Sequence, residues 1–172
     1  MENLETVVFV LKKDHLRKMV CLYLKMKKIG SGKRNGCGGK FDPLKDRDIF
    51  DTAIRELEEE SSVVCTRENL TLCAVIEFFH FGNSTDTPDH KVAFFTISNY
   101  KGEPKEVEPD KMQDPQWYDC TNLPKDMLPA DKEFAPKIFA GEIFTGKVYF
   151  KENFAGVENS QYTPVSQDAL VI

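Results

Sequence analysis

The stretch that decides the fold runs from Gly38 to Val63 and reads GGKFDPLKDRDIFDTAIRELEEESSV. Its second half has the spacing of an amphipathic helix over residues 48–61, with one apolar stripe that must be buried. The apolar positions of this stripe are Ile49, Phe50, Ala53, Ile54 and Leu57. Asp46 or Asp48 can cap the helix, and an acidic side chain there also suits the helix dipole. We therefore expect a capped helix that follows a charged loop.

Segments on both sides of this helix have the composition of strands, because they are rich in β-branched and aromatic residues. Strands are expected over residues 6–10, 18–25, 70–82, 91–99, 116–119 and 143–150, and a second helix over residues 131–141. This order of elements predicts an α+β fold in which a mixed β-sheet is sandwiched between helices. The domain is expected to span residues 1–154, and residues 155–172 are expected to form a C-terminal tail without regular structure.

Composition narrows the classes of function. The chain has 172 residues, a net charge of −5 and 41% hydrophobic residues, which suits one domain with a substantial core. The acidic balance argues against binding a nucleic acid polymer, since such proteins usually carry a basic face. No apolar run approaches the roughly 20 residues of a membrane span, and the N-terminal sequence does not have the pattern of a signal peptide. The five cysteines form no CxxC pair, as is typical of thiols in a reducing compartment, so we expect a cytoplasmic protein. We also expect a monomer.

Three glutamates of the expected helix, Glu56, Glu59 and Glu60, stand at positions i, i+3 and i+4, so their carboxylates share one face. Because like charges on one face repel each other, this arrangement favours a bound cation. Hard divalent ions with oxygen ligands, magnesium above all and manganese next, fit such a site. Arg55 is available to hold one of the carboxylates by a charge-assisted hydrogen bond. A solvent-exposed acidic face without a ligand is the ordinary alternative.

The pattern R-E-L-x-E-E-x-x-V over residues 55–63, with Gly38-Gly39 upstream, resembles the Nudix box. The resemblance implies a Nudix fold and a magnesium-dependent enzyme that cuts a pyrophosphate bond. It also implies that Glu56, Glu59 and Glu60 bind the metal ions, with the backbone carbonyl of Gly38 as a further ligand. Glu59 is then expected to accept the proton of the attacking water.

Several positions depart from the family pattern. The first glutamate of the motif falls on Arg47 here, the loop before the helix is longer, and Ser62 stands in place of the last glycine. Asp46 or Asp48 can replace the missing glutamate through the longer loop. A further acidic metal ligand, which the family places before the 116–119 strand, falls near Lys111, with Asp110 and Glu108 as acidic neighbours.

The resemblance extends beyond the box, to the oxidised-purine nucleoside triphosphatases of the family. It is carried by RNGCGGK (34–40), QWYDCTNLPKDMLPADKEFAPKIF (116–139) and FTGKVYF (144–150). Enzymes of that group hydrolyse oxidised dGTP-type nucleotides to the monophosphate and pyrophosphate. Their base-clamping Trp-Pro-Asp-Asp reads Leu128-Pro129-Ala130-Asp131 here, so a stacking face and one member of a hydrogen-bonding pair are missing.

The same resemblance assigns side chains to the substrate, a nucleoside triphosphate. Asn35 and Asp131 are expected to contact the base, and Lys27 the phosphates. Apart from the resemblance, Phe78, Phe79 and Phe81 are more typical of a core, but one of them, Phe78, is expected to face the substrate from its strand. His80, which alternates with apolar residues in that strand, is expected to line the pocket opposite Asn35.

Two alternatives to hydrolysis of a nucleoside triphosphate stay open. The chain could be a Nudix-fold module that binds a nucleotide without hydrolysing it, which the altered first half of the box favours. It could also be a Nudix enzyme that acts on another nucleoside diphosphate-linked compound, such as a dinucleoside polyphosphate or a nucleotide sugar.

Overall fold

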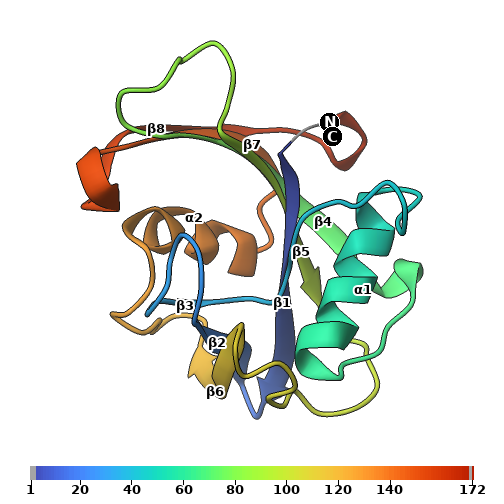
Figure 1. Ribbon diagram of the computed structural model, residues 1–172. Coiled ribbons are helices and arrows are strands. Elements are labelled where there is room, and N and C mark those ends of the chain that lie inside the picture. The colour runs from blue at the N-terminus through green and yellow to red at the C-terminus, as the bar shows by residue number, and fades with distance from the viewer. Residues whose placement is uncertain (1–2, 171) are drawn as a thin grey trace.

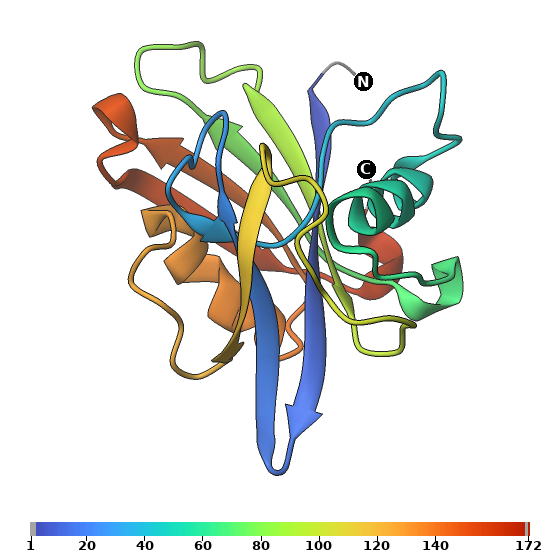
Figure 2. The ribbon, with the colours of Figure 1, turned by 60° about the horizontal axis from the view of Figure 1, so that its bottom comes forward.

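In the computed structural model, which describes residues 3–170 and 172, eight strands form one mixed sheet (Figure 1). The strands are β1 (Leu4–Asp14), β2 (Arg17–Lys25), β3 (Arg34–Asn35), β4 (Thr71–Phe79), β5 (His90–Ile97), β6 (Met112–Asp119), β7 (Phe144–Phe150) and β8 (Val157–Pro164). Their order is β3-β2-β1-β5-β4-β7-β8, and β6 also pairs with β2. The pairs β1–β5 and β4–β7 are parallel, and the other pairs are antiparallel. Figure 2 shows the hairpin of β1 and β2 projecting at the bottom of the view, with β6 beside it.

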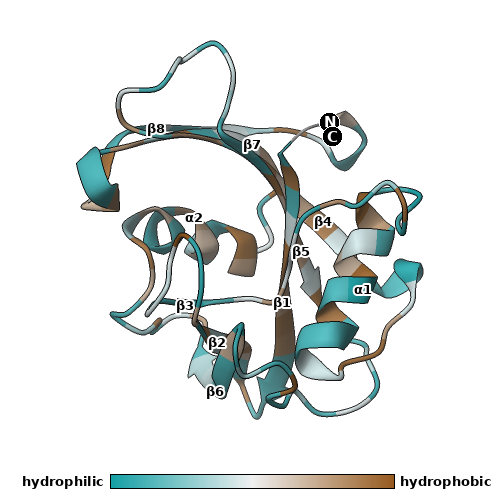
Figure 3. Ribbon diagram, viewed as in Figure 1, coloured by the Kyte–Doolittle hydropathy of each residue, from teal (hydrophilic) through white to brown (hydrophobic). Residues whose placement is uncertain are grey.

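The two longer helices, α1 (Ile49–Ser61) and α2 (Pro129–Phe139), cover opposite faces of this sheet (Figure 1). Each helix packs against a separate apolar core. Ala53 and Leu57 of α1 belong to the core on one face of the sheet, and Phe134 and Ile138 of α2 belong to the core on the other face. Figure 3 shows the apolar residues concentrated on the central strands, whereas the helices carry both polar and apolar residues. The predicted α+β fold, a mixed sheet sandwiched between helices, is confirmed. Within the described residues, neither helix is long and apolar enough to cross a membrane.

Helix α1 begins as its sequence predicts. The Asp48 carboxylate accepts hydrogen bonds from the backbone N–H groups of Phe50 and Asp51, at 3.0 and 3.2 Å, so Asp48 is the cap. The residue that caps the C-terminal end of the helix is Ser62, whose φ of 62° lies in the left-handed region. Glycine adopts that conformation without steric cost, and the motif has glycine at this position.

The C-terminal segment differs from the prediction. Residues 155–172 were expected to lack regular structure, but β8 lies within them and pairs antiparallel with β7, from Phe144↔Pro164 to Phe150↔Val157. The prediction was wrong because β8 is an edge strand and most of its side chains are exposed, so its sequence lacks the alternation of a half-buried strand. Tyr162 packs against the α2-side core, and Ser160 donates to Glu133 of α2 at 2.9 Å. The division of the chain at residue 154 stays a prediction.

The glycine-rich segment after β3 lies directly against β1. The backbone N–H of Val8 donates to the carbonyl of Cys37 at 2.7 Å, and that of Thr6 donates to the carbonyl of Gly39 at 2.9 Å. A Cβ atom at Gly38 would lie 1.9 Å from the Thr6 carbonyl oxygen, so only glycine fits. This close approach places the loop between β1 and the acidic face of α1.

Candidate active site

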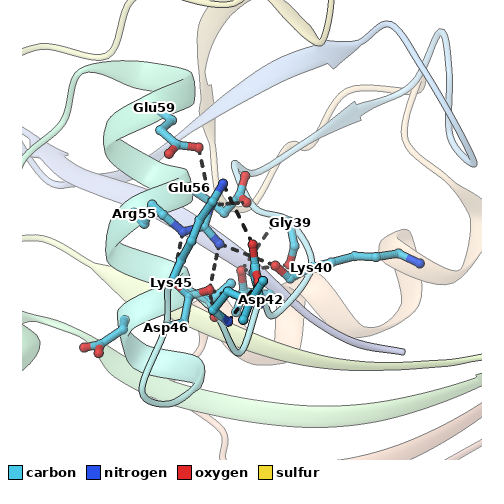
Figure 4. Close-up of polar contacts among 12 residues, drawn as sticks. Gly39, Lys40, Asp42, Lys45, Asp46, Arg55, Glu56 and Glu59 are labelled. Atoms are coloured by element: carbon cyan, nitrogen blue, oxygen red, sulfur yellow. Dashed lines mark hydrogen bonds and ion pairs between the residues drawn. The ribbon is translucent and has the colours of Figure 1, made fainter. Parts of the chain in front are cut away.

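Arg55 is the centre of the polar network on α1 (Figure 4). Its guanidinium donates two hydrogen bonds to Asp46, from Nε at 2.8 Å and from Nη2 at 2.7 Å. Its Nη1 donates to Glu56 at 2.6 Å and to Glu59 at 3.3 Å. The bidentate contact with Arg55 lowers the pKa of Asp46 to about 2, helped by a hydrogen bond from Thr52. Of the two aspartates considered for the missing glutamate of the motif, Asp46 therefore binds Arg55, whereas Asp48 caps the helix.

Glu56 and Glu60 both reach the glycine loop, because positions i and i+4 of a helix lie on the same face. The backbone N–H of Gly38 donates to Glu60 at 2.9 Å. A Cβ atom at Gly39 would lie 2.4 to 2.5 Å from the carboxylate of Glu56, so Gly39 makes room for that carboxylate. Burial raises the pKa of Glu60 to about 7, and the charge of Glu56 acts in the same direction, whereas the Gly38 N–H opposes both.

Glu59, the third glutamate, is turned away from this pair. Its side chain is 44% exposed and contacts Arg55 at the edge of the network (Figure 4). Among residues 3–170 and 172, no three His, Cys, Asp or Glu side chains lie close enough together to hold a metal ion. The structure thus brings together Glu56, Glu60 and Gly38 of the predicted metal ligands, but not Glu59.

A pocket of about 420 Å³ opens between the sheet and α2 and collects the residues predicted to contact the base. Asn35, Phe78 and Asp131 all line it. Asn35 uses its side-chain oxygen to accept the N–H of Gly36 at 2.8 Å, which leaves its side-chain NH2 group available as a donor. Asp131 is only 5% exposed, and burial raises its pKa to about 7.

A smaller cavity of about 170 Å³ continues from Asn35 to Glu60, past Gly38. Lys25 lines both cavities and therefore stands between the glutamate pair and the base pocket. Lys111 lines the smaller cavity beside Glu60, at the place where the family pattern implied an acidic ligand. The site is therefore continuous, with carboxylates at one end, lysines in the middle and an apolar pocket at the other end.

The predicted contact of Lys27 with the phosphates stays a prediction. Lys27 borders the smaller cavity, but its ammonium group is directed to Asp110, which it contacts at 2.7 Å on the surface. Lys27 follows the end of β2, whereas Lys25 is the last residue of that strand and lines the base pocket as well as the smaller cavity. Lys25 and Lys27 are two residues apart, so strand alternation places both side chains on the same side and does not distinguish the two lysines.

Two further pocket residues were missed, and one was anticipated. His80 lines the same pocket as Asn35, as expected. His90 and Glu5 also line it, and they stand two positions before Val92 and Val7 on their strands. Only the strand pairing brings these side chains together, so no local pattern of residues indicates them.

Comparisons with known proteins agree with this architecture. An oxidized purine nucleoside triphosphate hydrolase of Danio rerio is 39% identical over 105 residues, which are 61% of this chain and 61% of that protein. The chain thus spans less than two thirds of that relative's length.

Solved structures with low sequence identity share the fold. A MutT protein from Bacillus halodurans has a TM-score of 0.72 at 18% identity and covers 95% of this chain and 99% of its own. The NUDIX domain of Shewanella oneidensis NrtR, solved with ADP ribose, has a TM-score of 0.60 at 14% identity, over 80% and 89% of the two chains. An Ap4A hydrolase of C. elegans has a TM-score of 0.54 at 18% identity, over 80% and 96%. The family model of the NUDIX domain matches residues 3–138, and the chain therefore belongs to the NUDIX domain family.

Proposed function

We propose that this protein is a Nudix pyrophosphohydrolase, which hydrolyses a nucleoside triphosphate to the nucleoside monophosphate and pyrophosphate. The observation that carries the proposal is the continuity of the site. Glu56 and Glu60 stand at one end of joined cavities, and Asn35 and Asp131 stand at the other end. A nucleotide has the same order of groups, with polyphosphate at one end and a heterocyclic base at the other.

The donor set at the glutamate end fits magnesium or manganese. Glu56 and Glu60 place two carboxylates beside each other in a partly buried position, which a divalent cation would stabilise. Such a cation would polarise the phosphate and the attacking water when bound. Gly38 has a backbone carbonyl next to the N–H that already holds Glu60.

The roles of the other polar residues follow from their contacts. Arg55 positions Glu56 by the 2.6 Å contact, and Asp46 fixes Arg55 in turn. Glu59 makes the longest of the carboxylate contacts of Arg55 and is largely exposed, so its side chain is free to turn toward the cavity and accept the proton of water. Lys25 is placed to contact the phosphates between the two ends.

The relative from Danio rerio supports an oxidised purine nucleotide as the substrate. The pocket suits a heterocycle, because Phe78, Phe94 and Phe150 supply apolar walls and Asn35 and Asp131 supply hydrogen bonds. Leu128 also lines the pocket, and its branched side chain offers packing without the stacking face of an aromatic ring.

The test is pyrophosphate release from canonical and C8-oxidised deoxynucleoside triphosphates, a dinucleoside polyphosphate and a nucleotide sugar, with and without magnesium. We expect Glu59→Gln to lower magnesium-dependent release at least about 100-fold, because it removes the proton acceptor. Glu58→Gln is the matched control, since Glu58 is the neighbouring exposed glutamate and should leave the rate unchanged.

A nucleotide-binding module without hydrolysis is the second candidate, and the orientation of Glu59 toward Arg55 favours it. Nucleotide binding without turnover of any compound, unchanged in Glu59→Gln, would identify such a module. Turnover that survives Glu59→Gln would instead contradict the role of Glu59.

A further inference from the structure

Three titratable side chains share the sheet wall of the base pocket. They come from neighbouring strands: Glu5 from β1, His90 from β5 and His80 from the residue after the end of β4. His90 Nδ1 lies 2.7 Å from a carboxylate oxygen of Glu5. The rings of His80 and His90 lie 5.1 Å apart between their centroids, at an angle of 39°. The wall therefore contains a connected polar cluster in an otherwise apolar surface.

His80 is held in place on two sides. Its backbone N–H donates to Asp89 at 2.7 Å, and its ring meets the ring of Phe154 edge-on, with 5.0 Å between the centroids. Despite this, its Nε2 atom is buried and has no hydrogen-bond partner within the described part of the chain. The same is true of Oδ2 of Asp131, which enters the pocket from α2. Buried polar atoms are nearly always paired, so two such atoms in one pocket indicate a ligand that pairs with both.

The surroundings of His80 define what its Nε2 can do. Burial lowers the pKa of His80, with the charge of His90 acting in the same direction and that of Asp89 opposing it, so the ring is neutral at neutral pH. A carboxylate oxygen of Asp89 lies 4.0 Å from Nδ1. This negative charge favours the tautomer with the proton on Nδ1, which makes Nε2 a hydrogen-bond acceptor. The partner of Nε2 must then be a donor.

We propose that His80 is a specificity-determining residue, whose Nε2 accepts a hydrogen bond from an N–H group on one edge of the substrate's base while Asp131 pairs with another edge. This inference rests on the proposed function, because it concerns the base of the same nucleotide. The ligand class is a nucleotide whose base carries an N–H where a close analogue has a lone pair or a hydrogen on carbon. A purine oxidised at C8 gains an N–H at N7, and guanine carries an amino group that hypoxanthine lacks.

The experiment measures calorimetric affinities of nucleoside monophosphates without metal, so that hydrolysis plays no part. The two pairs are C8-oxidised against unmodified deoxyguanosine monophosphate, and deoxyguanosine against deoxyinosine monophosphate. We expect the unsubstituted protein to prefer the N–H-bearing member of one pair by about tenfold, the size of one well-formed hydrogen bond. His80→Phe should abolish that preference by weakening only the N–H-bearing member. His80→Gln, whose side-chain carbonyl can accept, should restore part of it.

His15→Asn is the matched control, because His15 is an exposed histidine in the turn between β1 and β2. It should leave both affinities of each pair unchanged. A preference that survives His80→Phe, an equal loss for both members of each pair, or an unsubstituted protein without any preference would overturn the assignment of His80. None of these three results affects the proposed hydrolysis, which is tested by pyrophosphate release. A protein that binds none of the four nucleotides would also overturn the assignment of His80, whereas only the absence of pyrophosphate release would overturn the proposed hydrolysis.

Discussion

At the glutamate end of the site, charged groups are paired with one another, whereas at the base end two buried polar atoms have no partner among residues 3–170 and 172. Arg55 joins Asp46 and Glu56, and Glu60 accepts the Gly38 N–H. The base pocket instead leaves Oδ2 of Asp131 and Nε2 of His80 in apolar surroundings. The difference indicates that the protein itself fixes the geometry of the catalytic end, while the base end acquires its full set of hydrogen bonds from a ligand.

The largest effect is expected from removing the partner of Arg55. Asp46→Ala leaves a mostly buried guanidinium without its bidentate acceptor, so we expect the free energy of unfolding to fall by about 3 kcal/mol. Pyrophosphate release should fall as well, because Glu56 loses its fixed position. Urea denaturation at pH 7 measures the first effect. Asp42→Ala, in the same loop but partly exposed, should change stability by less than about 1 kcal/mol. Equal effects of the two substitutions would contradict the paired network.

The next largest effect is expected at the base end, in the pH dependence of the free energy of unfolding. Because burial raises the pKa of Asp131 to about 7, the folded protein holds a proton that the unfolded chain releases near pH 4. The free energy of unfolding contributed by the Asp131 carboxyl group therefore falls as the pH rises from about 4 to about 7. Between pH 5 and pH 7, the unsubstituted protein should lose about 2 kcal/mol relative to Asp131→Asn, which cannot ionise.

Urea denaturation of both proteins at pH 5, 6 and 7 measures this difference. Glu133→Gln on the exposed side of α2 serves as the control and should follow the unsubstituted protein. Parallel stability profiles for the unsubstituted protein and Asp131→Asn would show that Asp131 is not held in an unfavourable environment.

The same contrast explains what the sequence could predict. The glutamate end is built from residues 38–60, so local rules for helix spacing and the family motif identify Arg55, Glu56 and Glu60, and capping rules leave Asp46 and Asp48 as the two candidates for the cap. The orientation of Glu59 escaped prediction because it depends on which carboxylates Arg55 binds.

The base pocket was harder to predict because its residues come from seven elements and the loops between them. Asn35 and Asp131 were identified only through resemblance to a family, and Phe78 only as one of several aromatic residues in its strand. Glu5 and His90 meet because β1 and β5 pair in parallel, a contact that no local pattern reveals. Strand β8 was missed for a related reason, since an exposed edge strand has little apolar alternation.

The smallest effect concerns a strained backbone position at the end of the helix that carries the glutamates. Ser62 ends α1 with a φ of 62°, a conformation that costs an L-residue with a side chain about 1 kcal/mol and costs glycine almost nothing. We expect Ser62→Gly to raise the free energy of unfolding by up to about 1 kcal/mol without changing pyrophosphate release. Ser61→Gly is the matched control: Ser61 lies inside the helix, where its hydroxyl donates to the Leu57 carbonyl, so glycine there should destabilise the protein. If both substitutions lower the free energy of unfolding, the backbone conformation of Ser62 at the end of α1 is not strained.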